Sequence, residues 1–94
     1  MAEDRLFKVK LISVIVPAYK QEGTIAEDLR RIHGVLAKLR HPTELICVVD
    51  GKIDKTFENA SSIAKKIPNL KVIGYETNRG KGYAVRFGMA ESRG

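Results

Sequence analysis

Three short apolar runs, each ending in a polar or glycine-rich segment, constrain the fold of this chain more than any other feature. They cover residues 11–16, 44–49 and 70–75, and each has the length of a β-strand. The first run is nearly continuous and rich in β-branched residues, which is typical of a strand buried on both faces of a parallel sheet. We therefore expect three strands of one parallel sheet.

Helical patterns follow each apolar run. Thr24 and, three residues later, Glu27 form a capping-box pattern at the start of the first helix. Asp54 or Thr56 can cap the second helix, and Asp54 is the expected capping residue. The expected helices cover residues 24–40, 54–67 and 80–92. The resulting order β-α-β-α-β-α predicts an α/β, Rossmann-like fold with a parallel three-stranded sheet and right-handed crossovers.

Two packing details follow from the helical patterns. Gly34, inside the first expected helix, indicates a close contact between that helix and the sheet. The third expected helix offers small and apolar residues for packing, namely Ala84, Phe87, Gly88 and Met89.

Length and composition are those of one small globular domain. The 94 residues form a single domain, with residues 1–10 as a leader segment before the first strand. There is no apolar stretch of the length that spans a membrane. Cys47, the single cysteine, lies in an apolar run and is expected to be a buried thiol, which favours a reducing, cytoplasmic compartment. His33 and His41 lack metal-ligand spacing, so no metal site is expected.

The first two strands end in residues with the chemistry of a binding site. In an open parallel sheet the carboxyl ends of the strands meet at one edge, where such folds bind nucleotides. Pro17-Ala18-Tyr19 follows the first strand, and its aromatic ring can stack on a base; the alternative is a plain loop in which the ring covers the core. Asp50 follows the second strand beside Gly51, and its carboxylate can accept from a base or a ribose; the alternative is a turn aspartate.

The segment after the third strand has the composition of a phosphate site. Asn78-Arg79-Gly80-Lys81-Gly82 combines two glycines, two basic residues and the start of a helix, whose dipole favours anions. The spacing matches neither a Walker loop nor the GxGxxG fingerprint. The alternative is a glycine-rich loop with incidental basic residues.

Together the three segments resemble the amino-terminal half of the GT-A-fold glycosyltransferases of inverting family 2, the group that includes dolichol-phosphate mannose synthases. That family typically reads V-S-V-I-V-P-A-Y-N-E, then V-D-D-G-S-x-D-x-T, then N-x-G-K-G-x-A-x-x-x-G. The likeness covers residues 11–94. The matching residues are Ser13 to Tyr19 in the first block, Asp50, Gly51, Asp54 and Thr56 in the second, and Asn78, Gly80, Lys81, Gly82, Ala84 and Gly88 in the third.

The resemblance implies that the donor is a nucleoside-diphosphate sugar, either a UDP-sugar or a GDP-sugar. It implies that Tyr19 lies in the nucleobase pocket, that Asp50 contacts the base or the ribose, and that Lys81 or Arg79 lies closest to the diphosphate. The residues that it assigns to the donor nucleotide are Pro17, Ala18, Tyr19, Glu22, Asp50, Asn78, Arg79, Gly80 and Lys81.

The chain departs from the family pattern around the expected pocket. Lys20-Gln21 stands in place of the family's Asn-Glu, and Glu22 is the expected substitute for that glutamate. Val49 replaces the first aspartate of the D-D pair, and Lys52-Ile53 replaces Ser-Thr.

The resemblance also implies groups that these 94 residues lack. In the family a later D-x-D motif holds Mg²⁺ or Mn²⁺ against the diphosphate, and the general base lies later still. We therefore expect an amino-terminal fragment that is inactive alone and holds no metal. The intact enzyme is expected to transfer sugar to a lipid-phosphate or saccharide acceptor, at the cytoplasmic face of a membrane. In the fragment the first strand is a bare sheet edge, which predicts self-association through Leu11–Val16.

Two other functions fit parts of the sequence. The net charge of +6, with Arg79, Lys81, Arg86 and Arg93 on and around the third helix, fits a module that binds RNA or another polyanion. No recognised nucleic-acid motif accompanies this charge. A nucleotidyltransferase with a related sheet is the third candidate, and it requires acidic metal ligands that the sequence lacks. The glycosyltransferase is therefore the favoured interpretation.

Overall fold

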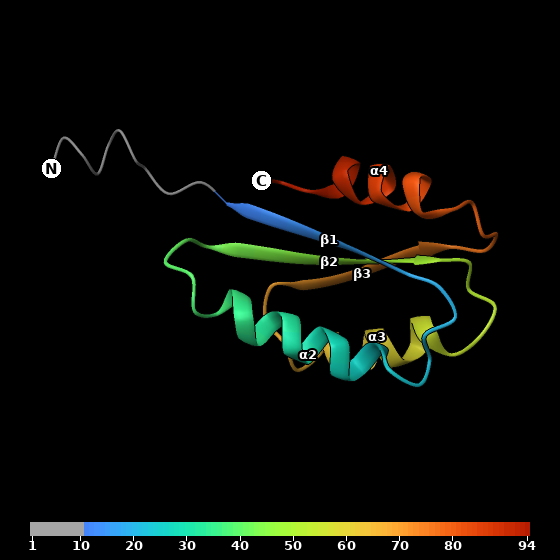
Figure 1. Cartoon of the computed structure of the whole chain (residues 1–94), viewed down its shortest axis with the longest axis horizontal. Helices are drawn as coiled ribbons and strands as arrows, with labels where there is room; N and C mark the ends of the chain where they lie inside the picture. The colour runs from blue at the N-terminus through green and yellow to red at the C-terminus, as the bar shows by residue number, and fades with distance from the viewer. Residues whose placement is uncertain (1–10) are drawn as a thin grey trace, which may run out of the picture.

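The computed structural model describes residues 11–94, so the expected leader segment at residues 1–10 lies outside the described residues. Six elements alternate between strand and helix along the chain (Figure 1). They are β1 (Ile12–Ala18), α2 (Ile25–Leu36), β2 (Thr43–Asp50), α3 (Thr56–Ala64), β3 (Leu70–Tyr75) and α4 (Lys81–Glu91). The predicted order of elements is confirmed.

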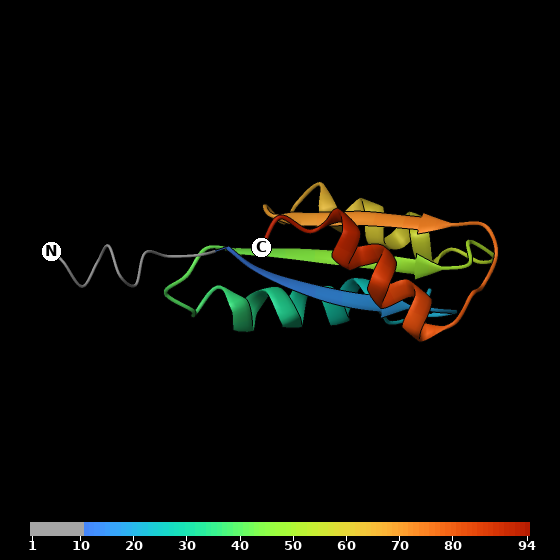
Figure 2. The ribbon, with the colours of Figure 1, turned by 90° about the horizontal axis from the view of Figure 1, so that it is seen from above.

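The three strands form one parallel sheet in the order β1-β2-β3. Val14 of β1 is level with Leu45 of β2, which is in turn level with Leu70 of β3. Helices α2 and α3 lie on one face of the sheet and α4 lies on the other (Figures 1 and 2). This layering confirms the predicted Rossmann-like arrangement.

Strand β2 is the most buried element because it lies between two neighbouring strands and two helix layers. Leu45, Cys47 and Val49 belong to the core between the sheet and helices α2 and α3, whereas Ile46 and Val48 belong to the core under α4. Cys47 is completely buried, as predicted, and burial raises the pKa of its thiol to about 12.

Strand β1 packs against a core on both faces, through Val14 and Val16 on one and Ile15 on the other, but these side chains are only partly buried, which is less than predicted. The reason is its position at the edge of the sheet, with a partner on one side only among the described residues. Helix α2 also ends earlier than expected, at Leu36 rather than near Arg40. Beyond it the N–H groups of Lys38 and Leu39 bond to carbonyls only three residues back, which is the tighter winding that often ends a helix.

The two predicted helix starts behave differently. Thr24 directly precedes α2, but its side chain accepts no hydrogen bond, so the predicted capping box does not form. Asp54, by contrast, accepts a hydrogen bond through Oδ1 from the N–H of Thr56 at 2.9 Å. Thr56 is the first residue of α3, so Asp54 satisfies one of the free N–H groups at that helix start, although the N-cap position itself is occupied by Lys55.

Close packing between helix and sheet occurs at Gly88, which the sequence predicted to be available for packing, and not at Gly34. A Cβ placed on Gly34 would have no atom within 4 Å, so the predicted contact there is wrong. A Cβ on Gly88 of α4 would lie 2.6 Å from Cγ2 of Ile15 and 2.9 Å from Cγ2 of Val48. Met89, expected to pack, is 60% exposed because it lies on the outer side of α4.

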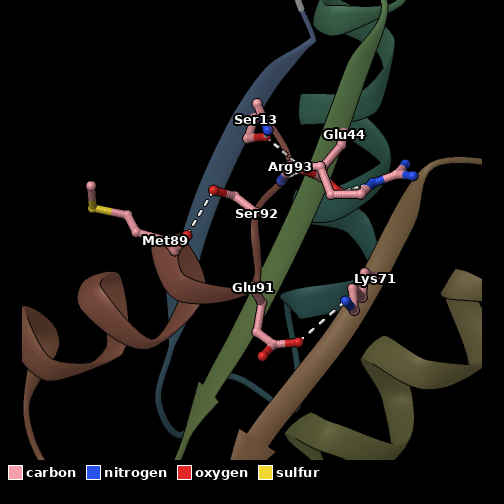
Figure 3. Close-up of polar contacts among 8 residues, drawn as sticks. Ser13, Glu44, Lys71, Met89, Glu91, Ser92 and Arg93 are labelled. Atoms are coloured by element: carbon pink, nitrogen blue, oxygen red, sulfur yellow. Dashed lines mark hydrogen bonds and ion pairs between the residues drawn. The ribbon is translucent and has the colours of Figure 1, made fainter.

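The segment that leaves α4 is held by a buried carboxylate at the amino end of β2 (Figure 3). Glu44 accepts hydrogen bonds through Oε1 from the hydroxyl of Ser13 at 2.6 Å and from the N–H of Arg93 at 2.7 Å. The N–H of Gly94 in turn donates to Oγ of Ser13. The bond from the Arg93 N–H, followed by that from Ser13, holds the pKa of the Glu44 carboxyl below its ordinary value.

Candidate functional site

The carboxyl ends of β1 and β2 and the loop before α4 enclose one open cavity of about 610 Å³. It lies at the end of the sheet toward which the strand arrows point (Figure 1). Tyr19, Asp50 and Lys81, which the sequence predicts to share one edge of the sheet, all line it. The full lining is Pro17, Ala18, Tyr19, Gln21, Asp50, Asn78, Gly80 and Lys81.

The first wall is the end of β1 and the turn after it. Ala18 is buried, whereas Tyr19 is 41% exposed, so its ring does not serve to cover the core. The Nζ atom of Lys20 lies 5.4 Å from the centre of that ring, and Lys20 has a φ of 51°, in the left-handed region. This turn therefore leaves an aromatic side chain at the mouth of the cavity.

Gln21 lines the cavity, although the sequence reasoning did not assign it to the site. Its backbone N–H donates to Oγ1 of the buried Thr56 at 2.8 Å, and its Oε1 accepts from the N–H of Tyr19 at 3.2 Å. These two bonds fix the turn between β1 and α2. The signal for Gln21 was present in the sequence, because it stands where the family's first block has its glutamate.

Glu22, the expected substitute for that glutamate, is not among the residues that line the cavity. Its carboxylate accepts a hydrogen bond from the N–H of Lys55 at 2.9 Å, and its backbone carbonyl accepts from the side chain of Asn59. Glu22 therefore connects the turn after β1 to the start of α3. The choice between adjacent residues depends on the path of this turn, which the sequence pattern does not reveal.

Asp50, the last residue of β2, is 3% exposed and accepts four hydrogen bonds. Oδ1 accepts from the hydroxyl of Tyr75 at 2.7 Å and from the N–H of Arg79 at 2.8 Å. Oδ2 accepts from Nδ2 of Asn78 at 2.6 Å and from the N–H of Gly80 at 3.0 Å. Burial acts to raise the pKa of this carboxyl, but the hydrogen bonds outweigh it and hold the pKa below its ordinary value.

The end of β2 approaches the loop before α4 closely at Gly51, and glycines with a positive φ stand in both segments, at Gly51 and Gly80. Gly51 has a φ of 98°, and a Cβ there would lie 3.1 Å from the backbone nitrogen of Asn78. Gly80 has a φ of 93° directly before α4. Because residues with a Cβ rarely adopt this conformation, both positions favour glycine. The special backbone that the sequence predicted at Gly51 is thus present.

The two basic residues of the third segment point in different directions. Lys81 lines the cavity and begins α4, so its charge adds to the positive end of that helix. The Arg79 guanidinium instead lies 5.2 Å from the ring centre of Tyr83, and Arg79 is not among the lining residues. Of the two candidates for a diphosphate contact, the geometry therefore favours Lys81.

The other substituted positions are also placed away from the cavity lining. Val49 is buried in the core shared with α2 and α3. Lys52 lies with its Nζ 4.1 Å from the ring centre of Phe57, an arrangement that favours a cation–π contact.

The cavity lining does not fit a resident divalent metal. Among residues 11–94 there is no group of three or more His, Cys, Asp or Glu side chains that could hold one. Asp50 is the single carboxylate in the lining, and both of its oxygens are already hydrogen-bonded.

A parallel α/β sheet with an open cavity at the carboxyl ends of its strands is typical of Rossmann-like domains, a class that binds ligands at this edge. Within that class, the sequence profile of the family described as Glycosyl transferase family 2 matches residues 13–94. The chain belongs to glycosyl transferase family 2, as its three sequence segments predict.

Several curated relatives carry the names of lipid-phosphate sugar transferases. The chain is 38% identical over 90 residues to the dolichyl-phosphate beta-glucosyltransferase of Drosophila melanogaster, a match that covers 88% of this chain and 28% of the relative. It is 29% identical over 89 residues to the undecaprenyl-phosphate 4-deoxy-4-formamido-L-arabinose transferase of Pseudomonas aeruginosa, covering 94% of this chain and 26% of the relative. The chain thus spans little more than a quarter of the length of these relatives.

Solved structures confirm the GT-A fold. One is the mannosyltransferase PcManGT from Pyrobaculum calidifontis in complex with GDP-Man and Mn²⁺, with a TM-score of 0.71 and 24% identity, covering 86% of this chain and 24% of that one. Another is the mannosyl-3-phosphoglycerate synthase from Rubrobacter xylanophilus, with a TM-score of 0.71 and 19% identity, covering 99% of this chain and 30% of that one. In the described part of this chain, every helix is too short or too polar to cross a membrane.

Proposed function

We propose that this chain is the nucleoside-diphosphate-sugar-binding portion of an inverting glycosyltransferase that uses a UDP-sugar or a GDP-sugar. The observation that carries the proposal is the cavity that brings Tyr19, Asp50 and Lys81 together at the carboxyl edge of the sheet. Membership of glycosyl transferase family 2 and the names of the relatives support it. The relatives' names also support a lipid phosphate as acceptor, a saccharide being the alternative. We further propose that the whole enzyme works at the cytoplasmic face of a membrane, where a lipid-linked acceptor would lie.

The cavity offers complementary chemistry to the two ends of a nucleoside diphosphate. Its volume of about 610 Å³ lies within the usual range for small-molecule sites. The exposed ring of Tyr19 provides a flat surface on which a base can stack. The ammonium group of Lys81 and the amino end of α4 favour the negatively charged diphosphate. Binding is therefore expected to rest on stacking at one end and charge at the other.

Binding is the part of the reaction that these residues support, and we infer that the chain alone does not transfer sugar. The sequence contains no D-x-D motif, and the cavity lining does not fit a metal. We expect the Mg²⁺ or Mn²⁺ requirement to belong to the whole enzyme, in line with the Mn²⁺ bound in the Pyrobaculum calidifontis mannosyltransferase complex.

Titration of the chain with UDP and GDP, followed by calorimetry, tests the proposal. Lys81→Ala should weaken binding about tenfold or more, the usual effect of losing a hydrogen bond to a charged group. Lys71→Ala is the matched control, because it removes the same charge from β3, where Lys71 pairs with Glu91. Absence of binding by either nucleotide at millimolar concentration, in a folded sample, would refute the proposal.

The same pair of variants tests the polyanion alternative, which the net charge of +6 favours. In that case both lysine variants should weaken binding to RNA by similar amounts, with a steep dependence on salt. Two of the basic residues around α4 already have partners within the protein, since Arg79 lies over the ring of Tyr83 and Arg93 pairs with Glu44. We therefore favour the nucleotide over nucleic acid as the partner.

We also propose self-association through the open edge of β1. The N–H of Ile12 bonds to the carbonyl just before β2, so the alternation of a strand directs the N–H groups of Ser13 and Ile15 to the open edge. Pro17 has no N–H to offer at the next open-edge position, so pairing is confined to the amino-terminal part of the strand. Sedimentation equilibrium should detect dimers, and a monomer at tens of micromolar would contradict the proposal.

A further inference from the structure

We propose that Asp50 is a positioning residue: its carboxylate holds the loop of residues 78–80 in place as a wall of the cavity, and it does not itself contact the nucleotide. The resemblance to the family implied a contact with the base or ribose. The effect on nucleotide binding rests on the proposed function, whereas the contact between Asp50 and the loop does not.

The hydrogen-bond capacity of the Asp50 carboxylate is used up within the protein. A carboxylate offers about four lone-pair positions. The four donors described above, from Tyr75, Asn78, Arg79 and Gly80, occupy two positions on each oxygen. With the residue 3% exposed, no acceptor position remains for a ribose hydroxyl or a base N–H.

The loop depends on these bonds for its path. The N–H groups of Arg79 and Gly80 both donate to the Asp50 carboxylate. Gly80, the last residue before α4, has a positive φ. Within the described residues, the side chain of Asn78 also donates to the Asp50 backbone carbonyl, at 3.4 Å. Asn78 and Gly80 line the cavity, so a shift of this loop changes the shape of the site.

Tyr75 supports Asp50 from outside the cavity. It does not line the cavity, and its ring packs edge-on against Tyr83 and Phe87 of α4, with centroids 5.1 Å apart in each case. Its hydroxyl donates to Asp50 at 2.7 Å. Tyr75→Phe therefore removes one of the four bonds to Asp50 without removing any atom from the site lining.

The test uses amide proton NMR and nucleotide titration on three variants of the full chain. Asp50→Ala and Tyr75→Phe perturb the loop, while Glu44→Ala is the matched control. Glu44 is also a buried carboxylate on β2 that accepts a backbone N–H, but it lies near the other end of the strand. Comparison of the two alanine variants separates loss of stability from loss of loop position.

In the chain without ligand, the amide protons of Arg79 and Gly80 should resonate downfield because both donate to a carboxylate. In Asp50→Ala these shifts should disappear, and protection from hydrogen exchange at both amides should fall about tenfold or more. The same variant should weaken UDP or GDP binding about tenfold. Tyr75→Phe should weaken binding about two- to tenfold, as expected for loss of a single hydrogen bond. Glu44→Ala should leave both the amide signals and the affinity unchanged.

Two results would overturn the proposal. The first is that the Arg79 and Gly80 amide signals of Asp50→Ala match those of the wild-type chain, since the loop would then not depend on the carboxylate. The second is weaker nucleotide binding in Asp50→Ala together with unchanged binding in Tyr75→Phe, which would indicate direct contact with the ligand. If neither nucleotide binds the wild-type chain, but the amide signals depend on Asp50, the proposed function fails and the contact between Asp50 and the loop stands.

Discussion

Substitution of Gly88 by alanine should destabilise the packing of α4 on the sheet. The added Cβ would lie 2.6 Å from Cγ2 of Ile15, 2.9 Å from Cγ2 of Val48 and 3.3 Å from Cδ1 of Ile15. Both neighbours are β-branched strand residues with restricted χ1 angles, so neither can turn aside easily. Val48 is also completely buried. The helix must therefore move away from the sheet to accommodate the methyl group.

The expected size of the effect follows from two opposing terms. Overpacking of a close-packed core costs about 1–3 kcal/mol. Replacement of glycine by alanine inside a helix contributes about 1 kcal/mol in the other direction. Gly34→Ala isolates the second term, because Gly34 lies in α2 with no atom within 4 Å of the added Cβ. The difference in unfolding free energy between the two variants should therefore be about 1–3 kcal/mol.

Urea denaturation followed by far-UV circular dichroism measures this difference. Gly34→Ala should raise the midpoint relative to wild type, and Gly88→Ala should fall below Gly34→Ala with an unchanged m-value. If Gly88→Ala raised the urea midpoint as much as Gly34→Ala, the close contact between α4 and β1 at Gly88 would be absent in solution, and the predicted overpacking would be refuted.

Two further predictions concern buried ionisable groups. Glu44→Ala should lower the unfolding free energy at pH 7 by about 1–3 kcal/mol, because it leaves donors of Ser13 and Arg93 unpaired. Folding lowers the pKa of Glu44. Its contribution to the unfolding free energy is therefore fully present above the pKa of Glu44 in the unfolded chain, about 4.3, and is lost as the pH falls through its pKa in the folded chain. Urea midpoints of variant and wild type should thus converge in acid, and a constant gap would contradict the assignment. Cys47, buried with a pKa of about 12, should react with iodoacetamide at mildly alkaline pH only when urea unfolds the chain, and rapid alkylation of native protein would show that the core is open.

The backbone arrangement could be predicted because the sequence is consistent at several levels. Apolar runs, helical patterns and turn residues all indicate the same alternation of strand and helix. Parallel strands place their carboxyl ends at one edge, so the joint location of Tyr19, Asp50 and Lys81 followed from topology alone.

Side-chain directions could not be predicted in the same way. Whether Gln21 or Glu22 lines the cavity depends on the path of one turn, and adjacent residues point to different places. The direction of Arg79 depends on the ring of Tyr83, four residues further along the chain. The half-exposure of β1 follows from its position at the sheet edge, which the apolar content does not indicate but the family resemblance predicted.

The two carboxylates of β2 help to explain how a helix whose fully buried residues are small keeps its place. The buried residues of α4 are Ala84 and Gly88, both small, so packing alone provides a limited hold on the helix. Asp50, at the end of β2, accepts hydrogen bonds from the N–H groups of the two residues before α4. Glu44, near the start of β2, accepts one from the N–H of Arg93, just after α4. Hydrogen bonds to charged acceptors are about twice as strong as neutral ones, so each carboxylate holds its own end of the helix: Asp50 holds the loop that enters α4, and Glu44 holds the segment that leaves it. The close contact at Gly88 lies between these two ends. It follows that Gly88→Ala, which pushes the middle of α4 outward, should weaken the hydrogen bonds between Asp50 and the loop as well as the packing of the core. The Arg79 and Gly80 amide signals should therefore shift in this variant, although Gly88 itself does not line the cavity.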